Sequence, residues 1–556
     1  MSMIPGPDEV LFVPLGGTGE IGMNLNVYGH DGAWLIVDCG VTFGDPAYPG
    51  VDVMMADPTF IEEQRDDLSG MLVTHAHEDH VGAVAHLWPR LRCPVYATPF
   101  TMAVLRRKLE EVGLAGKVPV EEIPMSGDIS VGPFDLTLVT LTHSIPEPNG
   151  VIVKTAAGTI FHTGDWKIDP EPLVGDTTDE AALRAVGEAG VLAMIGDSTN
   201  ATVDGESGSE ADVRESLQAL VGDFDNRVVF ACFASNIARV QSIAEVAHAH
   251  GRAVGLVGRS LWRMTEAARS TGYLRDLPPF VREEEVMQLP RDKVVMICTG
   301  SQGEPRAALS RIARDDHPNV SFDPDDVVIF SSRIIPGNEV PIGRLQNHLT
   351  AMGVRVITER DHFVHVSGHP ARDELRQMYQ WVRPQIAVPV HGEPQHLRAH
   401  AELARECQVP HAPLLSNGDV LRLHSKGPEI CGQVQFGRLA LDGRDLIRLD
   451  DGNLRARNHM LWNGSATLTV VVDRKGRVVS EPQLSAPGLL GDTDDDYALM
   501  DDIVDDVLDS LSSAKDSERR DDDILFERLR RTVRRSFRSR RGKNPATDVH
   551  LVRLEN

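Results

Sequence analysis

The hydrophobic and polar positions of this chain change period several times, which predicts a mixture of strands and helices. Across residues 25–37 apolar and polar residues alternate, then a turn occurs at His30-Asp31-Gly32, and an apolar run follows. A period near two predicts a β-hairpin in this stretch. Further apolar runs of strand length recur along the chain, and helical patterns lie between several of them. The expected fold class is therefore α/β.

A glycine-rich stretch, LGGTGEIGMN, stands directly before this hairpin, and its Gly17, Gly19 and Gly22 spell GxGxxG. That spacing marks a dinucleotide site only where a strand precedes it and a helix follows. Because a hairpin follows here, we interpret the match as a false one and expect no nucleotide cofactor. We expect these glycines to let a backbone loop approach another group closely.

The stretch MLVTHAHEDHVGA, residues 71–83, carries the densest candidate chemistry. Residues 71–74 read as a short buried strand, and a helix is expected from Val81 onward. Three imidazoles and a carboxylate at such a turn can supply ligands to two adjacent metal ions, and zinc or manganese suits these ligands. The alternative is a polar loop that is merely rich in histidine. The four side chains are His75, His77, Asp79 and His80.

Five apolar strands elsewhere in the chain end in a histidine or an aspartate. A lone residue of this kind after a strand is usually a turn residue. Five of them together with the histidine cluster instead predict a site at one edge of a sheet. These strand-ending residues are Asp38, His143, Asp165, Asp197 and His391.

The combined pattern resembles the metallo-β-lactamase superfamily, whose fold is a four-layer αββα sandwich. The resemblance implies two metal ions held by seven side chains, namely His75, His77 and His143 on one ion, Asp79, His80 and His391 on the other, and Asp165 bridging the two. Asp38 would support the cluster from outside the ligand set. The glycine loop 16–24 would then lie at the edge of the metal site.

The interval between Asp197 and His369 has its own alternation of strands and helices, which predicts a parallel sheet with ligand loops at the carboxyl ends of its strands. The segments GDSTNA, HVSGH and PVHGE resemble motifs A, B and C of the β-CASP nucleases. With FASNIARVQ and TGSQGEP the match narrows to the ribonuclease J family, over roughly residues 8–556. Glu147 and Trp166 depart from the family pattern and touch no ligand position.

The resemblance implies a zinc-dependent ribonuclease that trims RNA in the 5′-to-3′ direction from 5′-monophosphate ends and also cuts internally, in RNA maturation and decay. It implies two zinc ions per chain, with manganese or magnesium as substitutes, that activate the attacking water. It also points to His369 as proton donor to the leaving 3′-oxygen, with Asp197 orienting it or sharing the transfer. A structural turn histidine is the alternative for His369.

A pocket for the 5′-terminal phosphate would need small hydrogen-bond donors in loops. Four residues of the β-CASP interval and motif B are expected to supply them, and ordinary turn capping by Ser and Asn is the alternative. These residues are Ser235, Asn236, His365 and Ser367.

Composition bears on the remaining alternatives. The net charge of -26 repels a polyanion from the whole molecule, but a local positive site or bound metals can dominate nearby. The six cysteines lack CxxC spacing, no signal segment is visible, and no apolar run is long enough to span a membrane. We therefore expect a cytoplasmic protein with free thiols and no membrane partner. A β-CASP nuclease acting on DNA and a non-catalytic RNA-binding scaffold remain as alternative functions, although the complete ligand set argues against the scaffold.

The pattern changes again after about Leu449. ATLTVVVDRKGRVVS predicts a hairpin, residues 503–511 an amphipathic helix, and TDVHLVRL a closing strand. Residues 528–543 carry nine basic side chains and no acid, so this helix either contacts RNA or pairs with the acidic stretch 491–523. A small α+β domain results, whose expected role is self-association into a homodimer or homotetramer. RNA-degradation proteins are further expected partners.

Four segments make up the expected domain organisation. The metallo-β-lactamase domain is expected to occupy residues 1–208 and, with a linker, 361–449. The β-CASP domain is expected at 209–360 and the C-terminal domain at 450–556.

Overall fold

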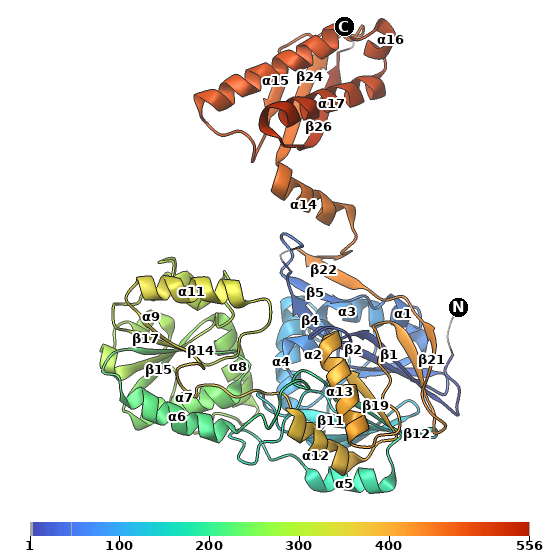
Figure 1. Cartoon of the computed structure of the whole chain (residues 1–556), viewed down its shortest axis with the longest axis vertical. Coiled ribbons are helices and arrows are strands. Elements are labelled where there is room, and N and C mark those ends of the chain that lie inside the picture. The colour runs from blue at the N-terminus through green and yellow to red at the C-terminus, as the bar shows by residue number, and fades with distance from the viewer. Residues whose placement is uncertain (1–3, 46, 555–556) are drawn as a thin grey trace. The chain divides into compact units, whose positions relative to one another are not determined.

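The computed structural model describes residues 4–45 and 47–554 and divides into two compact units (Figure 1). The larger unit comprises Met1–Thr42 and Met55–Arg438, and the smaller comprises Phe43–Met54 and Leu439–Asn556. Every predicted site residue belongs to the larger unit, which is described first.

Two β-sheets form the centre of the larger unit. The first has the order β21-β20-β1-β2-β3-β6-β7-β8, with strands Glu429–Gln433, Asp419–Leu423, Val10–Gly16, Leu25–His30, Ala33–Val37, Leu68–Leu72, Val95–Ala97 and Val120–Glu122. The second has the order β19-β13-β12-β11-β10-β9, with strands Ile386–Val390, Ala193–Asp197, Gly158–His162, Asn149–Thr155, Phe134–Thr140 and Asp128–Val131. The predicted hairpin is β2 and β3, whose turn residues Asp31 and Gly32 both have positive φ, as a tight hairpin turn requires.

Apolar side chains from both sheets meet in one buried cluster, which includes Phe12 and Leu35 from the first sheet and Val153 and Ile195 from the second. Helices cover the outer faces. On the second sheet lie α5 (Glu180–Ala189), α12 (Arg372–Val382) and α13 (Pro394–Glu406). Near the first lie α1 (Thr59–Glu62), α3 (Val84–Leu91) and α4 (Pro99–Glu111). This layering is the predicted αββα sandwich, which is confirmed.

A third layered element is inserted between β13 and β19. Its all-parallel sheet has the order β15-β16-β14-β17-β18, with strands Ala253–Val257, Val294–Cys298, Val228–Ala231, Val327–Phe330 and Arg355–Ile357. These strands are almost continuously apolar because helices cover both faces. One face packs on α6 (Glu210–Gly222), α7 (Ile237–Ala249) and α8 (Arg259–Ser270). The other packs on α9 (Glu283–Val286), α10 (Ala308–Ile312) and α11 (Glu339–Ala351).

The smaller unit is built around a three-stranded sheet of order β25-β24-β26, with strands Gln483–Ser485, Ser465–Val472 and Ala546–Arg553. Alternate residues of β24 are buried against α15 (Asp494–Ser512) and α17 (Asp522–Arg541). The unit also contains α14 (Gly452–Asn463) and α16 (Asp516–Arg519). Strands β4 (Val41–Phe43), β5 (Val53–Ala56), β22 (Arg438–Asp442) and β23 (Asp445–Arg448) form a four-stranded sheet.

The hairpin expected within ATLTVVVDRKGRVVS is present, since the chain turns after Asp473, Val478 pairs antiparallel with Val472, and the returning arm continues as β25 along β24. One detail differs from the expectations. The helix expected from Val81 onward begins earlier, since α2 (Glu78–Val81) already contains Asp79 and His80. Across the described ranges, no helix is long and apolar enough to cross a membrane.

Candidate active site

The candidate site residues lie close together, because most of them stand at or just beyond the ends of strands. Asp38 follows β3, Asp165 lies three residues beyond β12, and His391 follows β19. Asp197 is the last residue of β13, and the His75–His80 cluster runs from the loop after β6 into α2. Asp38 and His391 adopt positive φ values of 68° and 50°, which turn the chain sharply at these two positions. The structure thus brings together all the strand-ending residues that the sequence predicts at one edge.

One group of ligand atoms consists of three imidazole nitrogens and a carboxylate. His77 Nδ1 lies 3.1 Å from His75 Nε2 and 3.0 Å from His143 Nε2. Asp165 Oδ2 lies 3.9 Å from the same two Nε2 atoms. Ligands about 2.1 Å from a tetrahedral zinc ion are roughly 3.4 Å apart, so this spacing suits such an ion.

A second group shares Asp165 with the first. Asp165 Oδ2 lies 3.2 Å from His80 Nε2, and Asp165 Oδ1 lies 3.3 Å from His391 Nδ1. His391 Nε2 lies 3.1 Å from Asp79 Oδ2. Because Asp165 belongs to both groups, its carboxylate occupies the position of a bridging ligand. Its Oδ1 has no hydrogen-bond donor within the protein, as an oxygen reserved for a cation would.

The electrostatics of both groups favour cations. Burial, together with neighbouring histidines, lowers the pKa of His75 and His143, and burial lowers the pKa of His77 to about 4. All three imidazoles are therefore neutral at pH 7, the form that binds a metal. Burial alone would lower the pKa of His80 and His391, but carboxylates, Asp165 first among them, raise it. The second group thus attracts positive charge, which a metal ion would supply in place of these protons.

The outward-facing nitrogens of three ligand histidines are bonded to fixed protein groups. His75 Nδ1 lies 3.0 Å from Thr74 Oγ1, His80 Nδ1 2.7 Å from Asp38 Oδ2, and His143 Nδ1 2.5 Å from the carbonyl oxygen of Gly368. Such bonds fix the tautomer and leave Nε2 for the metal. Asp38 also accepts hydrogen bonds from the backbone N–H and hydroxyl of Thr74. Asp38 thus bonds His80 and Thr74 without belonging to either group of candidate ligand atoms.

Asp38→Asn should weaken metal binding without removing a ligand. The amide lacks the charge that holds His80, so we expect metal affinity to fall about 10–100-fold. Competition with a chromophoric chelator measures this affinity. Asp31→Asn, at the exposed hairpin turn, is the matched control and should bind metal like the parent. Unchanged affinity in Asp38→Asn would remove Asp38 from the site.

The glycine loop lies against these ligands. Gly17 accepts a backbone hydrogen bond from His391 at 2.6 Å, and Thr18 pairs with Gly392. A Cβ on Gly17 would stand 2.3 Å from Asn24 Oδ1, so the close packing requires glycine, and its φ of +83° favours glycine too. Gly22 leads directly into β2, with no helix between. Close packing explains Gly17, and the positive φ values of Gly19 and Gly22 explain the other two glycines of GxGxxG.

Asp197 and His369 form a pair beside the ligand groups. His369 Nδ1 lies 2.8 Å from Asp197 Oδ2 and 3.9 Å from Asp165 Oδ2. Burial alone would lower the pKa of His369, but the charges of Asp197 and Asp165 outweigh it and raise the pKa. The side chain keeps 23% of its surface exposed, whereas Asp197 has none. His369 can therefore hold a proton that an incoming substrate can reach.

The four predicted phosphate contacts lie on two segments that one buried arginine joins. Asn236 Oδ1 caps α7 by accepting the backbone N–H of Arg239 at 2.8 Å. Arg239 in turn donates to the carbonyl oxygen of Val364, next to His365, at 2.9 Å. The Nδ1 atom of His365 is buried without a partner in the protein. Ser235 and Ser367 are both partly exposed, and Ser367 Oγ accepts hydrogen bonds from Asn200 and the His369 backbone.

Several functional positions were missed from the sequence. Asn24 donates to the carbonyl oxygen of Asp79 at 3.1 Å, and Asn200 donates to that of His369 at 3.0 Å. Arg239 is fully buried and forms an ion pair with Glu210 at 3.0 Å, which ties α6 to α7. Asn24, Asn200 and Arg239 all lie inside the quoted motifs LGGTGEIGMN, GDSTNA and FASNIARVQ, and that position was the available signal.

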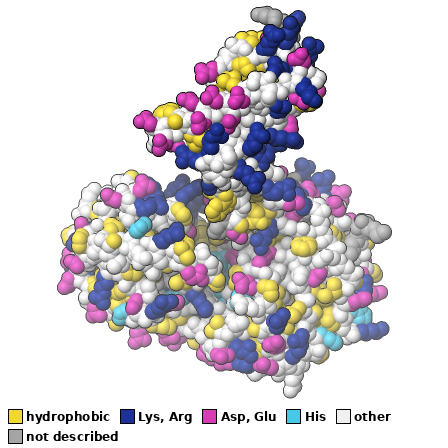
Figure 2. Space-filling model, turned by 45° about the horizontal axis from the view of Figure 1, so that its top comes forward, with side chains coloured by type: hydrophobic (Ala, Val, Ile, Leu, Met, Phe, Trp, Pro, Cys, Tyr) yellow, Lys and Arg dark blue, Asp and Glu magenta, His cyan; other side chains and the backbone are white. Residues whose placement is uncertain are grey.

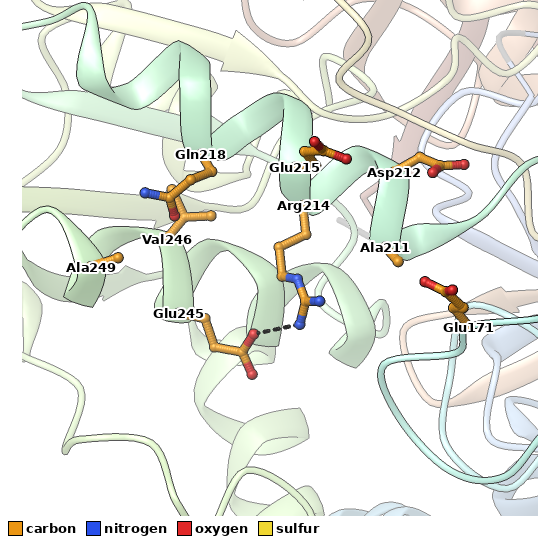
Figure 3. Close-up of a pocket in the computed structure, with 9 residues that line it drawn as sticks. All are labelled: Glu171, Ala211, Asp212, Arg214, Glu215, Gln218, Glu245, Val246 and Ala249. Atoms are coloured by element: carbon orange, nitrogen blue, oxygen red, sulfur yellow. Dashed lines mark hydrogen bonds and ion pairs between the residues drawn. The ribbon is translucent and has the colours of Figure 1, made fainter.

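A hollow elsewhere in the inserted domain is unsuited to RNA. Figure 3 shows it between α6 and α7, with Glu171 from a neighbouring loop. Four acids line it, and its one arginine, Arg214, forms an ion pair with Glu245 at 3.0 Å. Such a lining repels phosphodiesters. None of the predicted site residues contributes to it.

Comparison with family models divides the chain along the same lines. A β-lactamase superfamily domain matches residues 33–191, and a ribonuclease J β-CASP domain matches 225–349. An RNA specificity domain of Zn-dependent metallo-hydrolases matches 353–411, and a ribonuclease J C-terminal domain matches 452–554. Fold and site together define a hydrolase of the metallo-β-lactamase class that carries a β-CASP insertion.

Sequence identity to individual proteins identifies the family within this class. The chain is 44% identical to ribonuclease J of Sinorhizobium meliloti over 98% of both chains. It is 41% identical to ribonuclease J of Mycolicibacterium smegmatis over 87% of this chain and 88% of that one. The chain belongs to the ribonuclease J family. A solved protein of unknown function from Enterococcus faecalis shares the fold at a TM-score of 0.50 and 15% identity, over 75% of this chain and all of that one.

Proposed function

We propose that this protein is a two-zinc ribonuclease that removes nucleotides from 5′-monophosphate ends in the 5′-to-3′ direction and also cuts RNA internally. The observation that carries the proposal is the pair of ligand groups sharing Asp165, with the Asp197–His369 pair beside them. Manganese or magnesium would serve the same ligand set. RNA, rather than DNA, is the substrate of the relatives named ribonuclease J.

The proposed ligand residues form one set for each ion, with one residue shared between the two sets. His75, His77 and His143 would hold one ion, Asp79, His80 and His391 would hold the other, and Asp165 would bridge them. Bound there, the two ions would lower the pKa of a water molecule and offset negative charge on the attacked phosphate. A site with all seven ligands intact argues for catalysis rather than a scaffold role.

His369 and Asp197 would provide the proton that the leaving 3′-oxygen needs. When the phosphorus–3′-oxygen bond breaks, the 3′-oxygen needs a proton, and the other product keeps the 5′-phosphate. His369 holds its proton on the exposed side of the site while Asp197 accepts from Nδ1, which leaves Nε2 as the donor atom. General acid catalysis of this kind contributes about 10²–10⁴-fold.

Ser235, Asn236, His365 and Ser367 are proposed to receive the 5′-phosphate. Arg239 supports this proposal because it links the α7 terminus to the segment that holds His365. The buried Nδ1 of His365 still lacks a hydrogen-bond partner. A phosphate oxygen would meet such a group where a 5′-hydroxyl would leave it unsatisfied.

Exonuclease activity should therefore favour RNA with a 5′-monophosphate over RNA with a 5′-triphosphate or a 5′-hydroxyl. A triphosphate is larger and should clash with the pocket, and a hydroxyl would leave donors unpaired at about 1–3 kcal/mol for each buried group. Ser367→Ala should shrink the preference for monophosphate. Time-resolved products from one RNA sequence with each of the three ends measure this.

Two controls accompany this experiment. Internal cleavage of a circular RNA, which has no 5′ end, should change little in Ser367→Ala. Ser242→Ala, whose hydroxyl bonds only the Ala238 carbonyl within α7, should keep the parental preference. Equal exonuclease rates on all three ends in the parent protein would rule out the pocket and leave these residues as turn caps.

The C-terminal unit is proposed to mediate self-association into a dimer or tetramer. Its sheet has helices on one face only, and the other face carries half-exposed residues of β24 and exposed residues of β26. The basic helix α17 is partly neutralised within the unit, since Arg540 pairs with Asp506 and Arg541 with Asp496. Basic and acidic side chains accordingly occur together on this unit in Figure 2. Four of the six free cysteines are buried, in keeping with the cytoplasmic location that we propose.

A further inference from the structure

Three buried side chains form a hydrogen-bonded chain behind the candidate active site. Tyr379 Oη lies 2.7 Å from His400 Nε2, and His400 Nδ1 lies 2.8 Å from Ser198 Oγ. Tyr379 is 3% exposed, and the other two are fully buried. None of the three faces the ligand groups, so metal binding and proton transfer leave this chain unexplained.

Each member of the chain belongs to a segment that also carries an active-site group. Ser198 directly follows Asp197, at the end of β13. Tyr379 lies on α12, which begins three residues after His369, and His400 lies on α13, which begins three residues after His391. The Tyr379–His400–Ser198 chain therefore connects the three segments that deliver Asp197, His369 and His391.

The turn after β13 connects the Tyr379–His400–Ser198 hydrogen bonds to the candidate active site. Asp197 and Thr199 point to the site side, where Thr199 Oγ1 lies 2.7 Å from Asp197 Oδ1 and 3.1 Å from His391 Nδ1. Ser198, between them, points the other way, to His400. The His400 ring also packs on β13, since a Cβ on Gly196 would stand 3.2 Å from its Cε1. A shift of Ser198 would move Asp197 and Thr199 together.

The hydrogen bonds of the chain have one consistent direction. Burial lowers the pKa of His400 to about 4, so the ring is neutral and donates once and accepts once. The Ser198 hydroxyl donates to the carbonyl oxygen of Gly196 at 3.4 Å, which leaves its oxygen to accept from His400 Nδ1–H. Tyr379 O–H then donates to His400 Nε2. A neutral imidazole fits this arrangement without an unpaired polar atom.

We propose that Tyr379, His400 and Ser198 are positioning residues that set Asp197, and through it His369, relative to the metal ligand His391. The inference rests on the proposed function, because it assigns a role in the same reaction. Catalytic groups need placement to within about 0.5 Å, and a displacement of about 1 Å can cost about 10²-fold in rate. RNA binding and metal affinity depend on other residues and stay unaffected.

Tyr379→Phe and Ser198→Ala test the proposal by a split between kcat and KM. We expect kcat on 5′-monophosphate RNA to fall about 10–100-fold, while KM and the metal content per chain stay within about twofold of the parent. His250→Gln is the matched control, because His250 also bonds a neighbouring side chain, Gln218, but far from the site in the inserted domain. This control should retain the parental kcat.

A triple variant separates positioning from stability. Tyr379→Phe, His400→Leu and Ser198→Ala together remove every polar member, and replacing all partners by apolar groups can be nearly neutral for folding. We expect this variant to regain much of the thermal stability that the single variants lose, while kcat stays low. A kcat that returns to within about twofold of the parent would show that the chain only supports folding and would overturn the proposal.

The visible spectrum of the cobalt(II)-loaded protein gives a readout that needs no RNA. Its bands depend on ligand geometry, so Tyr379→Phe should shift them through His391, and His250→Gln should not. An unchanged spectrum together with an unchanged kcat would refute the positioning role. If the parent itself fails to cut RNA but the spectrum still shifts, the proposed function fails and the positioning inference stands.

Discussion

His77→Ala should lose bound metal and ribonuclease activity together. His77 Nδ1 lies 3.1 Å from His75 Nε2 and 3.0 Å from His143 Nε2, so its removal opens one side of the first ligand group. Metal ions of this kind supply several kcal/mol of transition-state stabilisation, and about 4 kcal/mol corresponds to roughly 10³-fold in rate. We expect activity to fall at least that far. Elemental analysis and RNA cleavage of the same preparation measure both losses.

His86→Ala is the matched control for this variant. His86 lies nine residues further along the chain, on α3, half-buried and outside both ligand groups. It should keep about two ions per chain and the parental rate. An active His77→Ala protein that retains both ions would remove His77 from the ligand set.

His369→Ala should keep both metal ions and still bind RNA, yet cut it about 10²–10⁴-fold more slowly. His369 is outside the seven-residue ligand set proposed for the two ions, and the charges of Asp197 and Asp165 raise its pKa, which favours the protonated form that a donor needs. Single-turnover cleavage, RNA binding and metal content together separate this loss from a failure to bind.

His362→Ala provides the comparison for His369→Ala. His362 is exposed, seven residues before His369, and should cut RNA at the parental rate. If His369→Ala also cuts at the parental rate, another group donates the proton, and Asp197 would have no partner to orient.

The grouping of the candidate site residues could be predicted from the sequence because most of them stand at strand ends. A strand of period two places its last residue at the sheet edge, so Asp38, Asp197 and His391 were recognisable one at a time. The cluster at His75–His80 needed no tertiary information. That the strand-end residues and the His75–His80 cluster meet at Asp165 followed from the two-sheet fold that the family resemblance implied.

Contacts across long sequence separations could not be predicted. Ser198 and His400 are 202 positions apart, and each is an ordinary residue type for its element. Arg239 and Val364 are 125 positions apart, and the contact depends on where the inserted domain returns to the sandwich. The periodicity of apolar and polar residues does not indicate such distant contacts, although these contacts hold the site together.

The C-terminal sheet was predictable on one edge of β24 only. The alternation within residues 466–480 predicts antiparallel pairing with its own returning arm, which the Val472–Val478 bridge and β25 form. The other edge of β24 pairs in parallel with β26, about 80 positions later. A period of two identifies a strand but does not identify a distant partner.

The most direct test of the central claim is reactivation of the metal-stripped protein by zinc, followed with 5′-labelled RNA and DNA of the same sequence. The two ligand groups that share Asp165 predict no cleavage without metal, a return of RNA cleavage that levels off at about two zinc ions per chain, and little cleavage of the DNA. RNA cleavage by the metal-free protein, or preferential cleavage of the DNA strand, would contradict a two-metal ribonuclease.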